Sequence, residues 1–189
     1  DNVNNLHPGT LQGNPSYILG QKIVSARRIG KVLILDFTNN YHMAIHVKLT
    51  GQLVYQDENT KQIPVSKDKV GSIPNKFTHV VFELSDNSRL YYNDQRRFGW
   101  IKVLNQGSLD ELSILKDMGP EPFAEITGSG QADLTLKKFE EIVSKKQTKI
   151  KPLLMDQTVI GGIGNIYAND ALFRAKIDPR RSAKSLSQK

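Results

Sequence analysis

Short apolar runs separated by turn residues dominate the chain between residues 21 and 103. Runs such as KVLILDF and HVVFELS are rich in β-branched and aromatic residues, and turn segments such as TNN and TG separate several of them. Runs of this length and composition are typical of β-strands. Strands at this spacing predict an antiparallel sandwich or barrel. The expected strands cover residues 22–30, 31–37, 42–49, 52–56, 79–85, 89–94 and 98–104.

The spacing of the apolar residues becomes helical after residue 107. The stretch SLDELSILKDMG predicts a helix that Ser108 caps and that ends before Gly119. The following GPEPF interrupts the pattern and marks a domain boundary. We therefore expect two domains, which comprise residues 1–122 and residues 123–189.

Three further helices are expected in the second domain. The stretch DLTLKKFEEIVSKK is amphipathic, because Leu136, Phe139 and Val143 recur at positions i, i+3 and i+7. The stretches KIKPLLMDQTV and NIYANDALFRAKI predict the other two helices, and Pro152 is tolerated in the first turn of the former. The expected fold class is therefore α+β, an antiparallel β-sandwich followed by a helical domain.

The composition narrows the class of protein. Of the 189 residues 38% are hydrophobic and 24% are charged, which is typical of a globular protein with a core. No apolar run approaches the roughly 18–20 residues that a membrane-spanning helix needs, so we expect no membrane partner. The chain has no cysteine, which excludes disulfides and cysteine-ligated zinc within it and fits a reducing, cytoplasmic compartment.

The positive charge of the chain is concentrated in its C-terminal part. Residues 1–136 contain 14 Lys and Arg against 14 Asp and Glu, whereas residues 137–189 contain 12 against 5 and supply the whole formal charge of +7. A basic excess confined to one region is the electrostatic footprint of a surface that binds a polyanion. A solvated basic face is the alternative interpretation.

Three glycines occupy four positions in the segment GGIGNIYANDALF, directly before a predicted helix. Either a tight turn between packed helices or the close approach of a phosphate to the backbone requires such freedom. Asn165 stands at the expected N-cap position, where its amide can also donate to a phosphate. The segment is not a Walker A loop, because no Gly-Lys-Ser/Thr follows it.

Two arginines and a large aromatic residue lie together in the segment NDQRRFGW. Either Arg96 or Arg97 forms an ion pair with Asp94, or an arginine contacts nucleic acid while Phe98 wedges between bases. Lys31 begins the apolar strand in RRIGKVLIL, where a lysine is either solvated or points into a cleft.

Five motifs, RRIGK, HVKLTG, NDQRRFG, MGPEP and KIKPLLMDQTVIGGIGNIYANDALF, resemble those of the formamidopyrimidine-DNA glycosylase family of bacterial base-excision repair enzymes. The resemblance runs in order and at family spacing from about Tyr17 to Pro179, and RRIGK and MGPEP favour the purine-specific branch. It implies a β-sandwich followed by a helix–two-turn–helix domain. It also implies a monomer that acts on damaged double-stranded DNA at the nucleoid in the bacterial cytoplasm.

The resemblance also implies a reaction. An N-terminal proline amine attacks C1′ of a flipped 8-oxoguanine or formamidopyrimidine nucleotide, a Schiff base forms, and β- and δ-elimination cut the strand, which is the AP lyase step. Flipping is necessary because the reacting carbon is inaccessible in the base stack.

Two alternatives to this enzyme remain. One is a duplex-DNA-binding module of the same fold without catalysis. The other is a basic RNA-binding β-protein, which needs stacking aromatic residues on one sheet face. The adjacent Tyr91 and Tyr92 point to opposite faces of a strand, which argues against the RNA-binding protein.

The resemblance assigns roles to individual residues. Lys31 matches the catalytic lysine that assists β-elimination. The residues that fill the space left by the flipped base are matched by Leu49, Arg96 and Phe98, with Leu49 in place of the usual methionine. The DNA-binding positions are matched by Arg96, Lys146, Lys151, Asn165 and His79, while a further family histidine is replaced by Phe77.

Two parts of the family pattern do not occur in this sequence: the proline–glutamate N-terminus with its first helix, and the C-terminal zinc finger with four cysteines. We therefore expect an internal fragment that binds no metal or cofactor of its own, with zinc in the missing finger of the parent protein. We expect this fragment alone to be inactive in excision of 8-oxoguanine.

Overall fold

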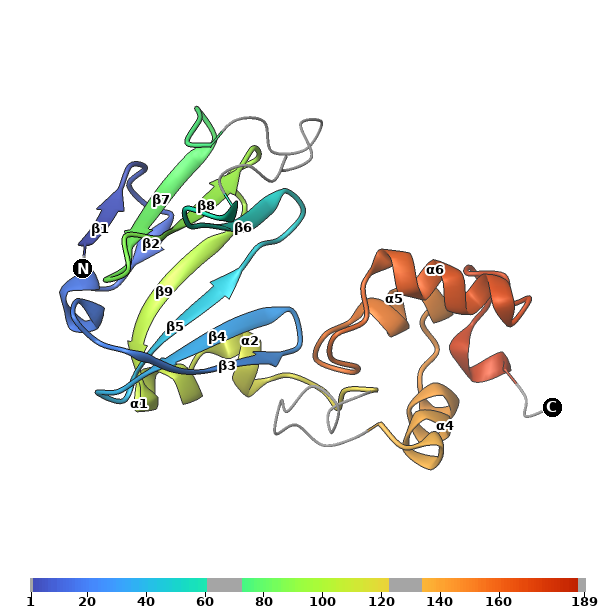
Figure 1. The fold of residues 1–189 in the computed structure, drawn as a ribbon. Helices are drawn as coiled ribbons and strands as arrows, with labels where there is room; N and C mark the ends of the chain where they lie inside the picture. Colours follow the sequence, from blue (N-terminus) through green and yellow to red (C-terminus); the bar gives the residue numbers. More distant parts are fainter. Residues whose placement is uncertain (1, 61–72, 123–133, 187–189) are drawn as a thin grey trace. The chain divides into compact units, whose positions relative to one another are not determined.

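The computed structural model describes residues 2–60, 73–122 and 134–186 of the chain (Figure 1). The chain forms two compact units, one of residues 1–26 and 32–109 and the other of residues 27–31 and 110–189. The boundary predicted between residues 122 and 123 adjoins a segment that lies outside the described residues.

Two β-sheets make up the first unit, and the α+β class with an antiparallel sandwich is confirmed (Figure 1). The four-stranded sheet has the order β1 (Asn2–Asn5), β7 (Thr78–Glu83), β8 (Arg89–Asp94) and β6 (Gly51–Gln56). The five-stranded sheet has the order β2 (Leu11–Gln12), β9 (Trp100–Asn105), β5 (Tyr41–His46), β4 (Val32–Phe37) and β3 (Ile23–Ile29). All pairs within the first sheet are antiparallel, and the two-residue β2 runs parallel to β9.

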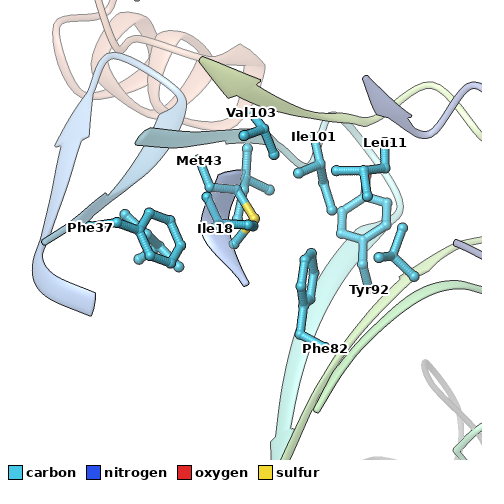
Figure 2. Packing of buried hydrophobic residues seen from close by; sticks show 11 residues of the cluster. Leu11, Ile18, Phe37, Met43, Phe82, Tyr92, Ile101 and Val103 are labelled. Carbon is cyan, nitrogen blue, oxygen red and sulfur yellow. The ribbon is translucent and has the colours of Figure 1, made fainter. Parts of the chain in front are cut away.

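The core of this unit lies between the sheets, because side chains alternate between the two faces of a strand. Ile101 and Val103 of β9 project toward Phe82 and Tyr92 of the other sheet (Figure 2). The buried cluster consists of Leu11, Ile18, Leu35, Phe37, Met43, Ile45, Val80, Phe82, Tyr92, Ile101 and Val103. Tyr91 is also buried, so neither tyrosine offers a ring on which RNA bases stack.

The polar N-terminal stretch contains three elements that its pattern does not predict. β1 has the sequence NVNN and owes its extended state to antiparallel pairing with β7, from Asn2 opposite Glu83 to Asn5 opposite Val80. β2 and a 3₁₀ helix, Pro15–Ile18, follow β1. Tertiary pairing therefore determines these elements more than local propensity does.

The single helix expected between the Ser108 cap and Gly119 is a wrong prediction. Two short helices, α1 (Gln106–Asp110) and α2 (Ser113–Lys116), occupy this stretch. Ser108 lies inside α1 and does not cap it, and its backbone N–H donates to the side-chain oxygen of Asn105 at 2.8 Å. Leu109 and Leu115 are both buried, although six positions along one continuous helix would put them on different faces.

The three other predicted helices are present in the second unit as α4 (Leu136–Lys145), α5 (Ile150–Met155) and α6 (Asn165–Arg174), and a 3₁₀ helix, Ala183–Ser185, follows them. Val143 of α4 is buried in their shared core, whereas Leu136 is 73% exposed and does not join it. That core consists of Val143, Ile150, Leu153, Leu154, Ile160, Ala168, Leu172 and Ala183. In the part of the chain that the structure describes, no helix combines the length and apolar character needed to cross a bilayer.

Replacement of Ile101 by Ala tests the position of the first core. Ile101 has no exposed surface, so its truncation leaves a cavity, and we expect a loss of about 2–5 kcal/mol in the free energy of unfolding. The matched control is Ile23→Ala, because Ile23 is 46% exposed, and it should cost less than about 1 kcal/mol. Urea titration measures both, and equal losses would contradict the assignment of the core.

Candidate nucleic-acid interface

Two loops of the first unit carry three of the predicted site residues. Leu49 lies in the 47–50 loop between β5 and β6, while Arg96 and Phe98 lie in the 95–98 loop between β8 and β9. Leu49 is 74% exposed and Phe98 is 57% exposed. The Arg96 guanidinium lies over the Phe98 ring, 4.8 Å from its centroid. Exposed apolar side chains beside a cation suit a surface that meets nucleobases.

The buried carboxylate of Asp94 connects these two loops. It accepts hydrogen bonds from the Thr50 hydroxyl and from the backbone N–H groups of Arg96, at 3.2 Å, and Gly99, at 2.8 Å. It therefore holds both ends of the 95–98 loop and ties that loop to the 47–50 loop. The ion pair considered between Asp94 and an arginine is not found among the described residues.

The hydrogen bonds of Asp94 decide its ionisation. Burial alone raises the pKa of this carboxyl group, but the donors from Thr50, Gly99 and Arg96 outweigh burial and lower the pKa below its ordinary value. Burial, with the nearby charge of Asp94, raises the pKa of the Tyr92 phenol. Asp94 is therefore ionised and Tyr92 is neutral at neutral pH.

Glycine is required at the end of the 95–98 loop. A Cβ atom on Gly99 would overlap the Tyr92 hydroxyl and approach the His46 carbonyl oxygen. The absence of a side chain at this position lets the backbone N–H of Gly99 reach Asp94. The pair FG in the motif thus combines an exposed aromatic ring with a close backbone approach.

His79 lies elsewhere than its predicted role requires. Its ring has no exposed surface, its Nε2 atom is 2.7 Å from the backbone oxygen of Asp94, and it packs edge-on against His7. A buried imidazole does not reach a DNA phosphate, which corrects the expected direct contact of His79 with DNA. His79 instead contacts the backbone of Asp94, the residue that holds the 95–98 loop. Phe77 donates its backbone N–H to the Asn75 side chain at 2.8 Å.

Lys31 and the glycine-rich segment come together in the second unit. The Lys31 Nζ atom donates to the backbone oxygen of Ile163 at 2.7 Å, across 132 positions of sequence. Its side chain also lies beside Gly164, where a Cβ atom would be 3.6 Å from Nζ. Lys31 is exposed. Its hydrogen bond to Ile163 nevertheless holds its amine at the start of α6.

A buried carboxylate also positions Lys31. Glu121 accepts from the backbone N–H of Gly30 and from the Arg28 guanidinium, the latter at 2.9 Å, and Arg28 also donates to the Gly30 carbonyl. Gly30 has a φ of 57°, in the left-handed region that glycine adopts without a steric penalty. These bonds fix the turn directly before Lys31. Sequence analysis missed this role of Glu121, although the residue lies within the quoted MGPEP motif.

Contacts and backbone conformation within the protein explain two glycines of the 161–164 segment. A Cβ atom on Gly161 would collide with the Gly119 carbonyl oxygen and the Met118 side chain, and Gly162 has a φ of 85°. The side-chain amide of Gln157 holds the segment through two hydrogen bonds. It accepts from the Gly162 N–H at 3.1 Å and donates to the Ile163 backbone oxygen at 2.9 Å. Tight packing thus accounts for Gly161, and the left-handed backbone conformation accounts for Gly162.

The N-terminus of α6 has no side-chain cap. Gly164 is the N-cap residue and Asn165 is the first helical residue, which corrects the predicted capping role of Asn165. The first backbone N–H groups of a helix lack acceptors one turn earlier, and the helix dipole makes this end positive. An exposed asparagine and the Lys31 amine beside such an end are an arrangement that suits an anionic group.

Lys146 and Lys151 lie in the connection that joins α4 to α5 and in the first turn of α5. Backbone hydrogen bonds hold this connection: Lys184 donates to the Lys146 oxygen at 3.0 Å, and Ala183 donates to the Thr148 oxygen at 2.9 Å. Lys146 is exposed and Lys151 is half-buried. The structure thus places Lys146 on a hydrogen-bonded connection and Lys151 on a helix, rather than on a free tail.

The residues present do not fit a zinc site. The sequence has no cysteine, and within the described ranges no three His, Asp or Glu side chains group closely enough to hold a metal ion.

Comparison with known proteins covers both units. Residues 3–101 match the family model described as the formamidopyrimidine-DNA glycosylase N-terminal domain, and residues 118–189 match that of the formamidopyrimidine-DNA glycosylase H2TH domain. A formamidopyrimidine-DNA glycosylase from Pelotomaculum thermopropionicum is 37% identical over 170 residues, which are 90% of this chain and 55% of the relative. One from Wolbachia sp. subsp. Brugia malayi is 34% identical over 98% of this chain and 60% of the relative. The chain thus spans little more than half the length of these two curated relatives.

Solved structures give the same comparison. The Lactococcus lactis protein in complex with DNA that contains FAPY-dG superposes with a TM-score of 0.80 and 26% identity, over 98% of this chain and 64% of that chain. The same protein bound non-covalently to DNA with an AP site has a TM-score of 0.79 and 26% identity, over 98% and 65%.

The lowered pKa of Asp94 predicts how stability depends on pH. A carboxyl group with a depressed folded-state pKa stabilises the fold fully above its unfolded pKa of about 3.9, and this contribution is lost as the pH falls through the folded value. We therefore expect Asp94→Asn to be less stable than the wild type at pH 7, and the difference to shrink below about pH 4. Thermal unfolding across this range measures it, and a difference that does not vary with pH would contradict the assignment.

Proposed function

Because the chain belongs to the formamidopyrimidine-DNA glycosylase family, we propose that it forms the lesion-recognition and DNA-binding part of a base-excision repair glycosylase. The proposed substrate is duplex DNA that contains an oxidised purine, either 8-oxoguanine or a formamidopyrimidine. The observation that carries the proposal is the pair of exposed apolar side chains, Leu49 and Phe98, on two loops that the buried Asp94 joins.

The exposed side chains of the two loops have the size and chemistry to fill a gap in a base stack. Extrusion of a nucleotide costs a few kcal/mol, and side chains that refill the space recover part of this cost. Phe98 supplies a ring that stacks on a base, and the Arg96 guanidinium above it supplies a planar cation. Leu49 fills space with less adaptability than the thioether of the methionine usual in the family.

The second unit supplies the contacts to the DNA backbone in this proposal. The uncapped N-terminus of α6, with Asn165 and the Lys31 amine beside it, binds one phosphate. Lys146 and Lys151 neutralise further phosphates, which agrees with the positive charge concentrated after residue 136.

The proposed chemistry is excision followed by β- and δ-elimination. The nucleophile in the family's reaction is an N-terminal proline amine, whereas the sequence here begins at Asp1. The part that we assign to this chain is that of Lys31, whose ammonium stabilises negative charge on the phosphate that leaves during β-elimination. Its hydrogen bond to Ile163 orients it for this role before DNA binds.

Phe98→Ala tests lesion recognition. We expect roughly tenfold weaker binding to a duplex with one tetrahydrofuran abasic analogue, because stacking on an aromatic ring is worth about 1–3 kcal/mol per base. Affinity for the matching intact duplex should change less than about twofold, since no gap is filled there. Fluorescence anisotropy measures both affinities.

The control for this test is Tyr55→Ala, which removes an aromatic side chain that is 45% exposed on β6. It should leave both affinities near the wild-type values. Equal losses on both duplexes with Phe98→Ala would indicate a disturbed loop and would contradict the proposed wedge.

Lys31→Gln tests the chemistry in the whole protein that contains this chain. We expect strand cleavage at an abasic site to slow by roughly a hundredfold, the lower end of what a positioned proton-transferring or charged group contributes. Lys31→Arg keeps the charge and should retain most of the rate. Single-turnover cleavage on a denaturing gel measures the rates, with thermal unfolding to compare the folds.

The outcomes separate the two candidate functions. Cleavage at the wild-type rate by Lys31→Gln would remove Lys31 from the mechanism. A wild-type protein that binds the abasic duplex but does not cleave it would be a DNA-binding module without catalysis.

A further inference from the structure

The same local arrangement occurs in both loops that carry an exposed apolar side chain. The residue directly before Leu49 is Lys48, and the residue directly before Phe98 is Arg97. Both are exposed cations with left-handed backbone conformations, with φ values of 51° for Lys48 and 56° for Arg97. Only glycine enters this region freely, since a Cβ atom crowds the following carbonyl oxygen.

Three hydrogen bonds in and around the 47–50 loop hold Lys48 in this conformation. The Lys48 backbone N–H donates to Nδ1 of the buried His46 at 3.0 Å, and the Gly51 N–H donates to the Val47 oxygen at 2.8 Å. Thr50 donates to Asp94. The turn therefore closes whether or not position 48 carries a side chain. Nothing in these bonds uses the Lys48 amine, and glycine would suit the backbone better.

The charge of Lys48 is not neutralised within the two loops. Asp94 is the one acidic residue in the segments 46–51 and 94–99, and its carboxylate is buried and accepts from three donors. Among the ion pairs of the described residues none includes Lys48. A lysine beside Leu49 that is exposed, has a strained backbone and takes part in no ion pair of the described residues points to a ligand.

We propose that Lys48 binds a phosphate of the DNA backbone next to the gap that Leu49 fills. The inference rests on the proposed function and deepens it, because it assigns a phosphate contact to the 47–50 loop itself. Every nucleotide carries a phosphate, so a side chain inserted at a base step has phosphates on both sides. A lysine one residue before the inserted side chain is within reach of them, and its contact is independent of sequence.

The test measures binding of the 189-residue chain to a duplex with one tetrahydrofuran abasic analogue, across a salt series. In Lys48→Gly we expect the slope of log K against log salt to fall by about 0.9, the value for one phosphate contact in duplex DNA. If this contribution vanishes at about 1 M salt, the variant binds roughly eightfold more weakly at about 0.1 M. Its Tm should not fall, because glycine relieves the left-handed strain.

Three further variants make the result specific. Lys48→Arg keeps the charge and should restore the wild-type salt slope. Lys22→Gln removes one positive charge at the other end of the sandwich, beside the turn between β7 and β8, and should leave the slope unchanged. Leu49→Ala should weaken binding without a change in slope, because leucine carries no charge.

The inference is overturned if Lys48→Gly binds the abasic duplex with the wild-type slope, if Lys48→Arg does not restore it, or if Lys22→Gln lowers it equally. Failure of the proposed function gives a different result. The wild-type chain would then bind neither the abasic duplex nor the matching intact duplex, and both the proposed function and the inference about Lys48 would be wrong. Weaker binding together with a lower Tm in Lys48→Gly would assign Lys48 a structural role and would also contradict the inference.

Discussion

A buried carboxylate that accepts hydrogen bonds from the backbone holds the functional loops of each unit. Asp94 binds the N–H groups at both ends of the 95–98 loop and the Thr50 hydroxyl, and Glu121 binds the Gly30 N–H and Arg28. Hydrogen bonds to an ionised acceptor are stronger than neutral ones, and a buried carboxylate without them is costly. Asp94 and Glu121 therefore each fix one loop conformation. This conformation determines where the neighbouring side chains lie.

The residues proposed to meet DNA are poor choices for stability alone. Leu49 and Phe98 leave apolar surface in water, and Lys48 holds a strained backbone angle. Neither feature contributes to the cores of the two units, which consist of ordinary aliphatic and aromatic packing. Strain and exposure at one place, supported by a satisfied hydrogen-bond network, are typical of sites shaped for a ligand.

The glycine-rich segment shows how one motif serves packing and binding together. Gly161 allows the close approach of residues 118–121, among them the Glu121 that fixes the turn before Lys31. The Lys31 side chain lies beside Gly164 at the start of α6. The position of the Lys31 amine at the open helix end therefore depends in part on Gly161, where packing inside the protein leaves no room for a side chain. Contacts within the protein explain the glycines of this segment without a ligand, and the proposed phosphate binds at the helix end that this packing leaves open.

The sequence by itself determined the strands from residue 22 onward, the three helices of the second unit and the family, because periodic burial and long motifs are local patterns. It also identified Lys31, Leu49, Arg96 and Phe98 as candidates. Only the tertiary structure decided that β1 is a strand, that residues 106–116 form two helices, and that His79 is buried. It alone revealed Asp94 and Glu121 as the acceptors that hold the loops. Such partners are far apart along the chain, 91 positions for Gly30 and Glu121, and no local pattern records which buried acceptor a backbone N–H will find.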